Sequence, residues 1–197
     1  LTRLRGRLLV VDPLNLIQVM LAEGNSVTER RIPTKILAET SVVVALSVIL
    51  KDILPPIYHL PQGGSITIAG LVPLLWFVLR WGFRYGLFAG FIYGLVHMAL
   101  GGYVINPIQG LLDYPLAFAA LGLAGLFKRY PLVGVGVGIA GRFMASFLSG
   151  ILFFTSPTLE GAVTSAVYNG TYLIGEFVIS AIVIYLLIKR NLIGIYL

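Results

Sequence analysis

The stretch Gln109-Gly-Leu-Leu-Asp113-Tyr114-Pro115 opens a long apolar run, Gly110 to Phe127, with the length and composition of a membrane-spanning helix. Asp113 lies about one turn inside that run. A carboxylate at the centre of a spanning helix costs about 2.5–3.5 kcal/mol, less near the interface, and such a group usually faces a cavity or a partner. The sequence therefore predicts that Asp113 is the electrostatic centre of a binding site.

The composition is that of an integral membrane protein. Of the 197 residues, 58% are hydrophobic and 11% charged, whereas soluble domains are about 45–50% apolar and about 25% charged. The net charge of +6 does not indicate nucleic-acid binding, because the basic residues lie at the ends of apolar runs. The sequence has no cysteine and two histidines, His59 and His97, so neither a thiolate nucleophile nor a cysteine metal site is expected. No metal or other cofactor is predicted.

Six apolar segments predict an all-α membrane protein with six transmembrane helices. They are Ile36–Leu50, Ile66–Leu79, Tyr85–Gly101, Gly110–Phe127, Pro131–Thr155 and Gly161–Ile188. A span needs about 20 residues, so the first two segments are extended into their flanks. Residues 35–190 are expected to form one substrate-binding domain in the cell membrane, followed by a C-terminal tail, 191–197. The N-terminal tail, 1–34, fits either a short amphipathic helix on the membrane surface or a loosely ordered segment.

Basic residues occur at every second boundary between these segments. The four clusters are Arg30, Arg31 and Lys35; Arg80 and Arg84; Lys128 and Arg129; and Lys189 and Arg190. With six spans, all four lie on one side, which the positive-inside rule assigns to the cytoplasm together with both termini. The outer connections are then 52–65, 102–109 and 156–160. The first is rich in proline and glycine, as expected of a lid.

Polar and aromatic side chains gather near the predicted depth of Asp113. From the residues themselves, the candidates for ligand binding are Tyr103, Gln109, Asp113, Tyr114, Thr164, Tyr168 and Asn169. Ser165, Asn169, Tyr172 and Glu176 follow one helical stripe, which faces the bundle interior because lipid disfavours such groups. A carboxylate, tyrosine rings and amides suit a small cationic ligand with aromatic character. Tyr103 and Tyr172 also fit a role as interface anchors, and Asn169 a hydrogen bond between helices.

Two further charges lie deeper in the predicted bundle. Arg142 and Glu176 are at matching depths, counted from the outer ends of their segments. We predict that they form a structural ion pair, so that mutating either residue alone destabilises the protein.

Several motifs occur together in a characteristic order. They are Leu60-Pro-Gln-Gly-Gly-Ser-Ile, Arg80-Trp-Gly, Leu111-Leu-Asp-Tyr, Ala117-Phe-Ala-Ala-Leu-Gly-Leu-Ala-Gly, Ser149-Gly-Ile-Leu-Phe-Phe and Tyr168-Asn-Gly-Thr-Tyr. Over residues 36–190 the chain resembles the thiamine-specific S-component of energy-coupling factor (ECF) transporters, above all Bacillus-type members. The resemblance implies a six-helix subunit that captures thiamine from outside and docks on a transmembrane coupling protein driven by two ATPases. The family's docking motif falls on Ser41 and Ala45.

The resemblance also assigns site residues. The pocket acid falls on Asp113, its aromatic neighbour on Tyr114, the loop tyrosine on Tyr103 and the asparagine on Asn169. A family histidine is replaced by Ser146, a tryptophan of some members by Phe154, and a tryptophan of the first loop by Ser65. The family's last tyrosine falls near Thr164, with Tyr168 a turn away.

The function expected is high-affinity thiamine uptake by a subunit that is not an enzyme. Because Ser146 replaces the histidine, uptake of the pyrimidine precursor is an alternative. A stand-alone proton-coupled carrier, with Asp113 or Glu176 as relay, is another. An intramembrane hydrolase with Ser146 or Ser149 as nucleophile is a third hypothesis. The sequence contains no phosphate-binding loop of the P-loop type, so energy must come from a partner or an ion gradient.

Overall fold

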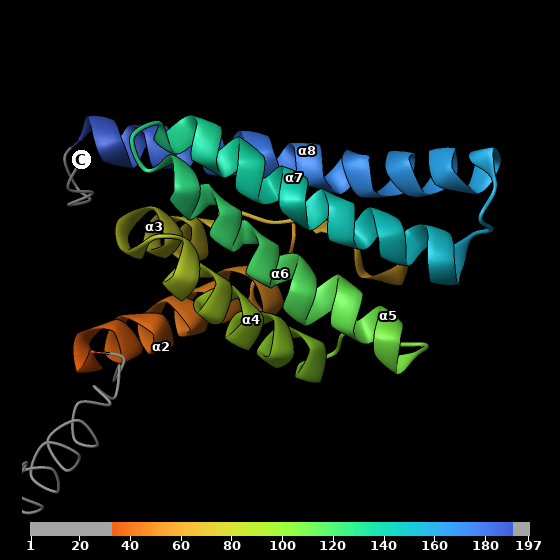
Figure 1. Ribbon diagram of the computed structural model, residues 1–197, viewed down its shortest axis with the longest axis horizontal. Helices are drawn as coiled ribbons and strands as arrows, with labels where there is room; N and C mark the ends of the chain where they lie inside the picture. The colour runs from red at the N-terminus through yellow and green to blue at the C-terminus, as the bar shows by residue number, and fades with distance from the viewer. Residues whose placement is uncertain (1–32, 191–197) are drawn as a thin grey trace, which may run out of the picture. The chain divides into compact units, whose positions relative to one another are not determined.

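The computed structural model describes residues 33–190 (Figure 1). The predicted N-terminal tail, apart from its last two residues, and the C-terminal tail lie outside the described residues.

Six helical rods make up the described part of the chain. They are α2 (Thr34–Val48) continued by η1 (Ile49–Ile53); α3 (Val72–Trp81); α4 (Phe83–Ala99); the joined α5 (Pro107–Leu111), η3 (Leu112–Leu116), α6 (Ala117–Ala120) and η4 (Leu121–Phe127); α7 (Pro131–Ser149) continued by η5 (Gly150–Phe154); and α8 (Leu159–Lys189). A small antiparallel hairpin of β1 (Tyr58–His59) and β2 (Ser65–Ile66), with the turn η2 (Pro61–Gly63), lies in the first long loop. Apart from this hairpin, the predicted all-helical architecture with six helices is confirmed.

Three of the described helices are long and apolar enough to cross a membrane. They are Pro107–Phe127, Pro131–Phe154 and Leu159–Lys189, of 21, 24 and 31 residues. The helix α3 has 10 residues and covers only about 15 Å. The predicted helix from Ile66 was wrong for residues 66–71, which form a strand end and turns. One reason is that Thr67 directs both its N–H and its hydroxyl to Glu176, at 3.1 and 2.8 Å.

Small residues bring α4 very close to the fourth rod, which lies between α4 and α7 (Figure 1). Gly86, Gly90 and Gly94 recur every fourth residue, on one face of the helix. A Cβ on Gly90 would lie 2.2 Å from the Phe118 carbonyl oxygen, and one on Gly94 would lie 2.6 Å from the Pro115 Cα. This close contact holds η3, the turn that carries Asp113, against α4.

The basic clusters within the described residues share one end of the bundle. The start of α2, the α3–α4 turn, the η4–α7 connection and the end of α8 all lie at the left of Figure 1. There Lys128 Nζ donates to the Arg80 carbonyl oxygen at 2.9 Å. Arg80 pairs with Glu39, which also accepts the indole N–H of Trp81 at 2.7 Å. The predicted grouping of positive charge therefore holds for the clusters at Lys35, Arg80, Lys128 and Lys189.

Candidate ligand-binding site

A cavity of about 190 Å³ lies at the other end of the rods, beneath the loop of residues 54–65. Eight of the nine predicted ligand-binding residues line it: Gln109, Asp113, Tyr114, Ser146, Phe154, Thr164, Tyr168 and Asn169. Tyr103 instead lines a second, adjoining cavity of about 430 Å³. These eight residues were predicted from the sequence, come from three different rods and surround one cavity in the structure.

Three rods widen into a π-helical turn where they reach the cavity. The turn η1 carries Lys51, η3 carries Asp113 and Tyr114, and η5 carries Phe154, all of which line the cavity. In η3 the cause is visible, because Pro115 has no N–H and the Ala117 N–H bonds to the Leu112 carbonyl, five residues back. Such turns often accompany functional sites, since they redirect a side chain that a regular helix would point elsewhere.

Asp113 is held by two hydrogen bonds from its own rod and from α7. The Gln109 amide donates to Oδ2 at 2.6 Å, and the Ser149 hydroxyl donates to the same oxygen at 2.7 Å. Both bonds end on Oδ2, so Oδ1 is the oxygen available to a ligand. Within residues 33–190, Asp113 takes part in no salt bridge. The structure therefore places an oriented carboxylate, without a paired cation, in the wall of a cavity.

The predicted pair of Arg142 and Glu176 is wrong. Glu176 is fully buried and its Oε1 lies 3.0 Å from Lys51 Nζ. Arg142 instead lies over the Phe118 ring, with Cζ 4.0 Å from the ring centroid. Matching depth did not specify the pairing, because Lys51 reaches Glu176 from η1 while the Arg142 side chain is directed toward Phe118.

Arg142 has unused hydrogen-bonding capacity in the cavity wall. It is 5% exposed, and its Nε and Nη1 have no hydrogen-bond partner among the described residues. A buried guanidinium with unpaired N–H groups is costly unless a ligand or water accepts from it. Asp113 and Arg142 thus give one cavity a hydrogen-bond acceptor and a set of donors of opposite charge.

The predicted interior stripe on α8 is confirmed by its burial. Ser165, Asn169, Tyr172 and Glu176 are each at most 5% exposed. The Asn169 amide donates to the carbonyl oxygens of Ser165 and Ser146, at 3.0 and 3.3 Å, and accepts from the Tyr172 hydroxyl at 3.0 Å. Asn169 therefore joins α8 to α7 and is held in a fixed orientation at the cavity.

The loop of residues 54–65, called the lid from here on, is seated on α8. The Gly64 N–H donates to the Tyr168 hydroxyl at 3.1 Å, and that hydroxyl donates to the Pro61 carbonyl oxygen. A Cβ on Gly64 would lie 2.9 Å from both the Tyr168 hydroxyl and the Tyr172 ring. A larger residue at position 64 would therefore force the lid or one of the two tyrosine side chains to shift.

Several cavity residues were not among the sequence candidates. They include Lys51, Gln62, Gly63, Gly64, His97, Arg142, Ser165 and Tyr172. Lys51 directly follows the first predicted apolar segment, and its inward direction follows from the wide turn η1, which sequence periodicity does not reveal. The predicted docking residues Ser41 and Ala45 lie elsewhere, exposed on α2.

Replacing Arg142 with methionine is expected to separate ligand binding from stability. We expect ligand affinity to fall about tenfold or more, since two donors are lost. The free energy of unfolding should change by less than about 1 kcal/mol, because the lost cation–π contact is offset by removing an unpaired buried charge. Isothermal titration and denaturant unfolding in detergent measure the two quantities. Strong destabilisation with unchanged affinity would show that Arg142 is a structural residue instead.

Long apolar helices around a polar cavity define a multi-pass membrane protein with an internal site for a small solute. Residues 37–194 match the family model described as thiamine transporter protein. The chain belongs to this family, which is one of transporters and not of enzymes.

Individual relatives agree with this assignment. The chain is 36% identical over 171 residues to the thiamine transporter ThiT of Bacillus subtilis (strain 168), covering 77% of this chain and 88% of that protein. A second ThiT, from Lacticaseibacillus paracasei, is 34% identical over 96 residues, which is 46% of each chain. The structure resembles that of ThiT from Listeria monocytogenes with a TM-score of 0.71 and 25% identity, covering 80% of this chain and 94% of that one.

Proposed function

We propose that this chain binds thiamine with high affinity and serves as the substrate-capture subunit of an ECF-type transporter. Thiamine occupies the cavity under the lid, with its thiazolium ring near Asp113. The observation that carries the proposal is the Asp113 carboxylate, oriented by Gln109 and Ser149 in a cavity wall and not paired with a cation among the described residues. A permanently cationic ring supplies the missing countercharge.

Aromatic rings near Asp113 support a ligand of this kind. Tyr114 and Phe154 line the cavity, and Tyr103 lies beside Phe154 with ring centroids 6.1 Å apart. Ring faces attract a cation by about 0.5–2 kcal/mol each. Thiamine therefore fits this part of the cavity through both its charge and its flat rings.

The pyrimidine ring is assigned to the side of the cavity where Arg142 lies. The side-chain amides of Gln109 and Asn169 already form hydrogen bonds with protein groups. Their main role is therefore to orient other residues of the site and not to bind the ligand. Arg142, with unpaired N–H groups, and the buried Ser146 hydroxyl are the groups that can meet the ring nitrogens. In this chain, Arg142 and Ser146 therefore provide the polar contact to the ligand that the family resemblance assigns to a histidine.

The transport partners are part of the same proposal. All six helices lie in the membrane with both termini in the cytoplasm, because the basic clusters share one end. Ser41 and Ala45 are exposed on α2 among exposed Leu37, Val42 and Leu46. Small residues on an apolar face allow a partner helix to approach closely, as docking on a membrane coupling protein with two ATPases requires.

Calorimetric titration tests the proposal. The purified protein is titrated with thiamine, with hydroxymethylpyrimidine and with the uncharged thiazole half. Heat is the preferred signal, since both tryptophans, Trp76 and Trp81, lie in α3 and not among the residues that line the cavity. We expect thiamine to bind at least about a hundredfold tighter than either half, a difference of about 2.7 kcal/mol. Equal affinity for the pyrimidine alone would assign the chain to precursor uptake, and no binding of any of them would overturn the proposal.

A further inference from the structure

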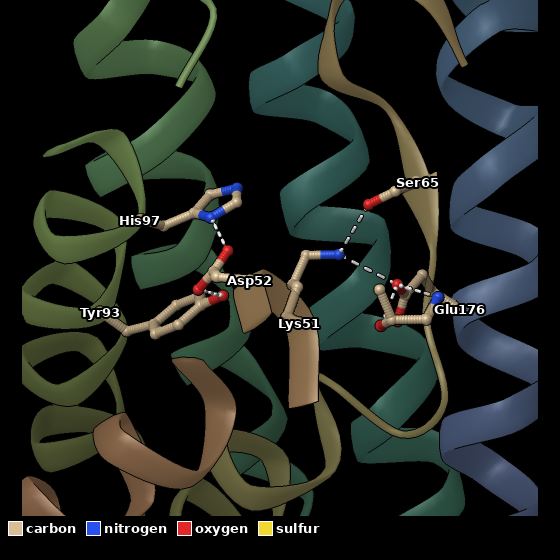
Figure 2. A network of polar contacts seen from close by, with 7 residues as sticks. Lys51, Asp52, Ser65, Tyr93, His97 and Glu176 are labelled. Carbon is tan, nitrogen blue, oxygen red and sulfur yellow. Dashed lines mark hydrogen bonds and ion pairs between the residues drawn. The ribbon is translucent and has the colours of Figure 1, made fainter. Parts of the chain in front are cut away.

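Two neighbouring charged residues of η1 point in opposite directions. Figure 2 shows Lys51 directed toward Ser65 and Glu176, and Asp52 directed toward Tyr93 and His97. The turn η1 is the last part of the α2 rod before the lid begins. One turn of backbone therefore connects α8 on one side with α4 on the other.

The Lys51 arm fixes the end of the lid. Lys51 Nζ lies 3.0 Å from Glu176 Oε1 and 3.4 Å from the Ser65 hydroxyl. The same Glu176 oxygen accepts from the N–H and hydroxyl of Thr67. Side chains of Lys51 and Glu176 are 2% and 0% exposed. The residues where the lid leaves η1 and where it returns are thus joined through one buried carboxylate.

The Asp52 arm reaches the wall of the cavity. Asp52 accepts from the Tyr93 hydroxyl at 3.0 Å and is hydrogen-bonded to His97 Nδ1. The His97 ring packs against Tyr114, with centroids 5.3 Å apart, and Tyr114 and His97 both line the cavity. Through His97, Asp52 thereby connects the start of the lid to the ring of Tyr114, which is next to Asp113 in the sequence.

Residues of both arms form the partition between the two cavities. Six residues line both of them: Lys51, Gln62, Gly63, Ser65, His97 and Tyr114. A ligand that passes between the cavity with Asp113 and the adjoining cavity with Tyr103 must cross this partition. Lys51 and His97 are held there by carboxylates, whereas Gln62 and Gly63 belong to the exposed tip of the lid.

We propose that Lys51 and Asp52 form a clasp that holds the lid shut over the cavity and sets the rate at which the ligand leaves. They are positioning residues, acting through the lid and through Tyr114. The inference rests on the proposed function for the identity of the ligand, but the closure of the lid can be tested without any ligand.

The first test measures amide hydrogen exchange of the lid in the ligand-free protein in detergent. The variant is Lys51→Met/Glu176→Gln, which leaves no unpaired buried charge and keeps an acceptor for Thr67. The second variant is Asp52→Ala, and the control is Lys128→Met, which removes a lysine that bonds a carbonyl at the basic end. We expect exchange in residues 57–66 to rise about tenfold or more in both clasp variants, with helix α7 unchanged. Lid exchange equal to that of the control would overturn the clasp.

The second test separates the rates of ligand binding. With tritiated thiamine, we expect the dissociation rate to rise about tenfold or more in both clasp variants while the association rate does not fall. A residue with only a general structural role would lower the amount of active protein without changing the dissociation rate. Unchanged dissociation beside faster lid exchange would overturn the kinetic role. If the unmodified protein binds no thiamine, the proposed function fails, and the exchange measurement alone decides the clasp.

Discussion

Replacement of Glu176 with leucine is expected to lower the free energy of unfolding by about 3–5 kcal/mol, because it leaves the buried ammonium of Lys51 without its carboxylate. The loss includes two hydrogen bonds from Thr67, whose N–H and hydroxyl both end on Glu176 Oε1. Thr67 is itself fully buried. Water cannot easily replace the missing acceptor, and the segment that leads into α3 loses its anchor.

Two double-mutant cycles test whether Glu176 forms its ion pair with Lys51 or with Arg142. The variant Lys51→Met/Glu176→Leu is expected to recover at least about half of the stability lost in Glu176→Leu, since no buried charge is left unpaired. Arg142→Met should be additive with Glu176→Leu to within about 0.5 kcal/mol. Denaturant titration in detergent micelles provides the measurement. Strong coupling between Arg142 and Glu176, with none between Lys51 and Glu176, would contradict the geometry described above.

Replacement of Asp113 with asparagine is expected to weaken thiamine binding about tenfold or more, equivalent to about 1.4 kcal/mol or more. An asparagine keeps an oxygen that can accept from Gln109 and Ser149. The substitution therefore removes the charge with little change in shape. Because the site is partly buried, the charge is poorly screened by solvent, and its removal should lower thiamine affinity strongly.

Glu160→Gln provides the matched control for Asp113→Asn. Glu160 lies in the first turn of α8, is exposed and is not among the residues that line the cavity. We expect its neutralisation to change thiamine affinity by less than about twofold, because exposed charges are screened by solvent and salt. Equal losses in both variants would mean that Asp113 acts only through the general negative charge of this end of the protein.

The sequence predicted the site best where a polar residue is costly in a membrane. Asp113, and the stripe from Ser165 to Glu176, stand out because lipid does not tolerate such groups. Helical periodicity then places the stripe on one face, and the structure buries that face. These predictions depended on physical constraints that act within a single segment.

Predictions that required knowledge of helix neighbours were weaker. Arg142 and Glu176 share a depth, but depth does not determine which side chain turns toward which, and Lys51 is the residue that meets Glu176. The direction of the Lys51 side chain depends on the π-helical turn η1, which helical periodicity in the sequence does not predict. Similarly, the apolar residues Ile66–Leu71 favour a helix locally, while contacts from Thr67 to α8 hold them in an irregular path.

The most direct test of the account compares two ligands in two proteins. Thiamine and its thiophene analogue, in which an uncharged ring replaces the thiazolium, are titrated into the unmodified protein and into Asp113→Asn. We predict that the substitution costs about tenfold or more for thiamine and less than about twofold for the uncharged analogue. Equal losses for the two ligands would contradict the claim that the carboxylate of Asp113 binds the ligand through its charge.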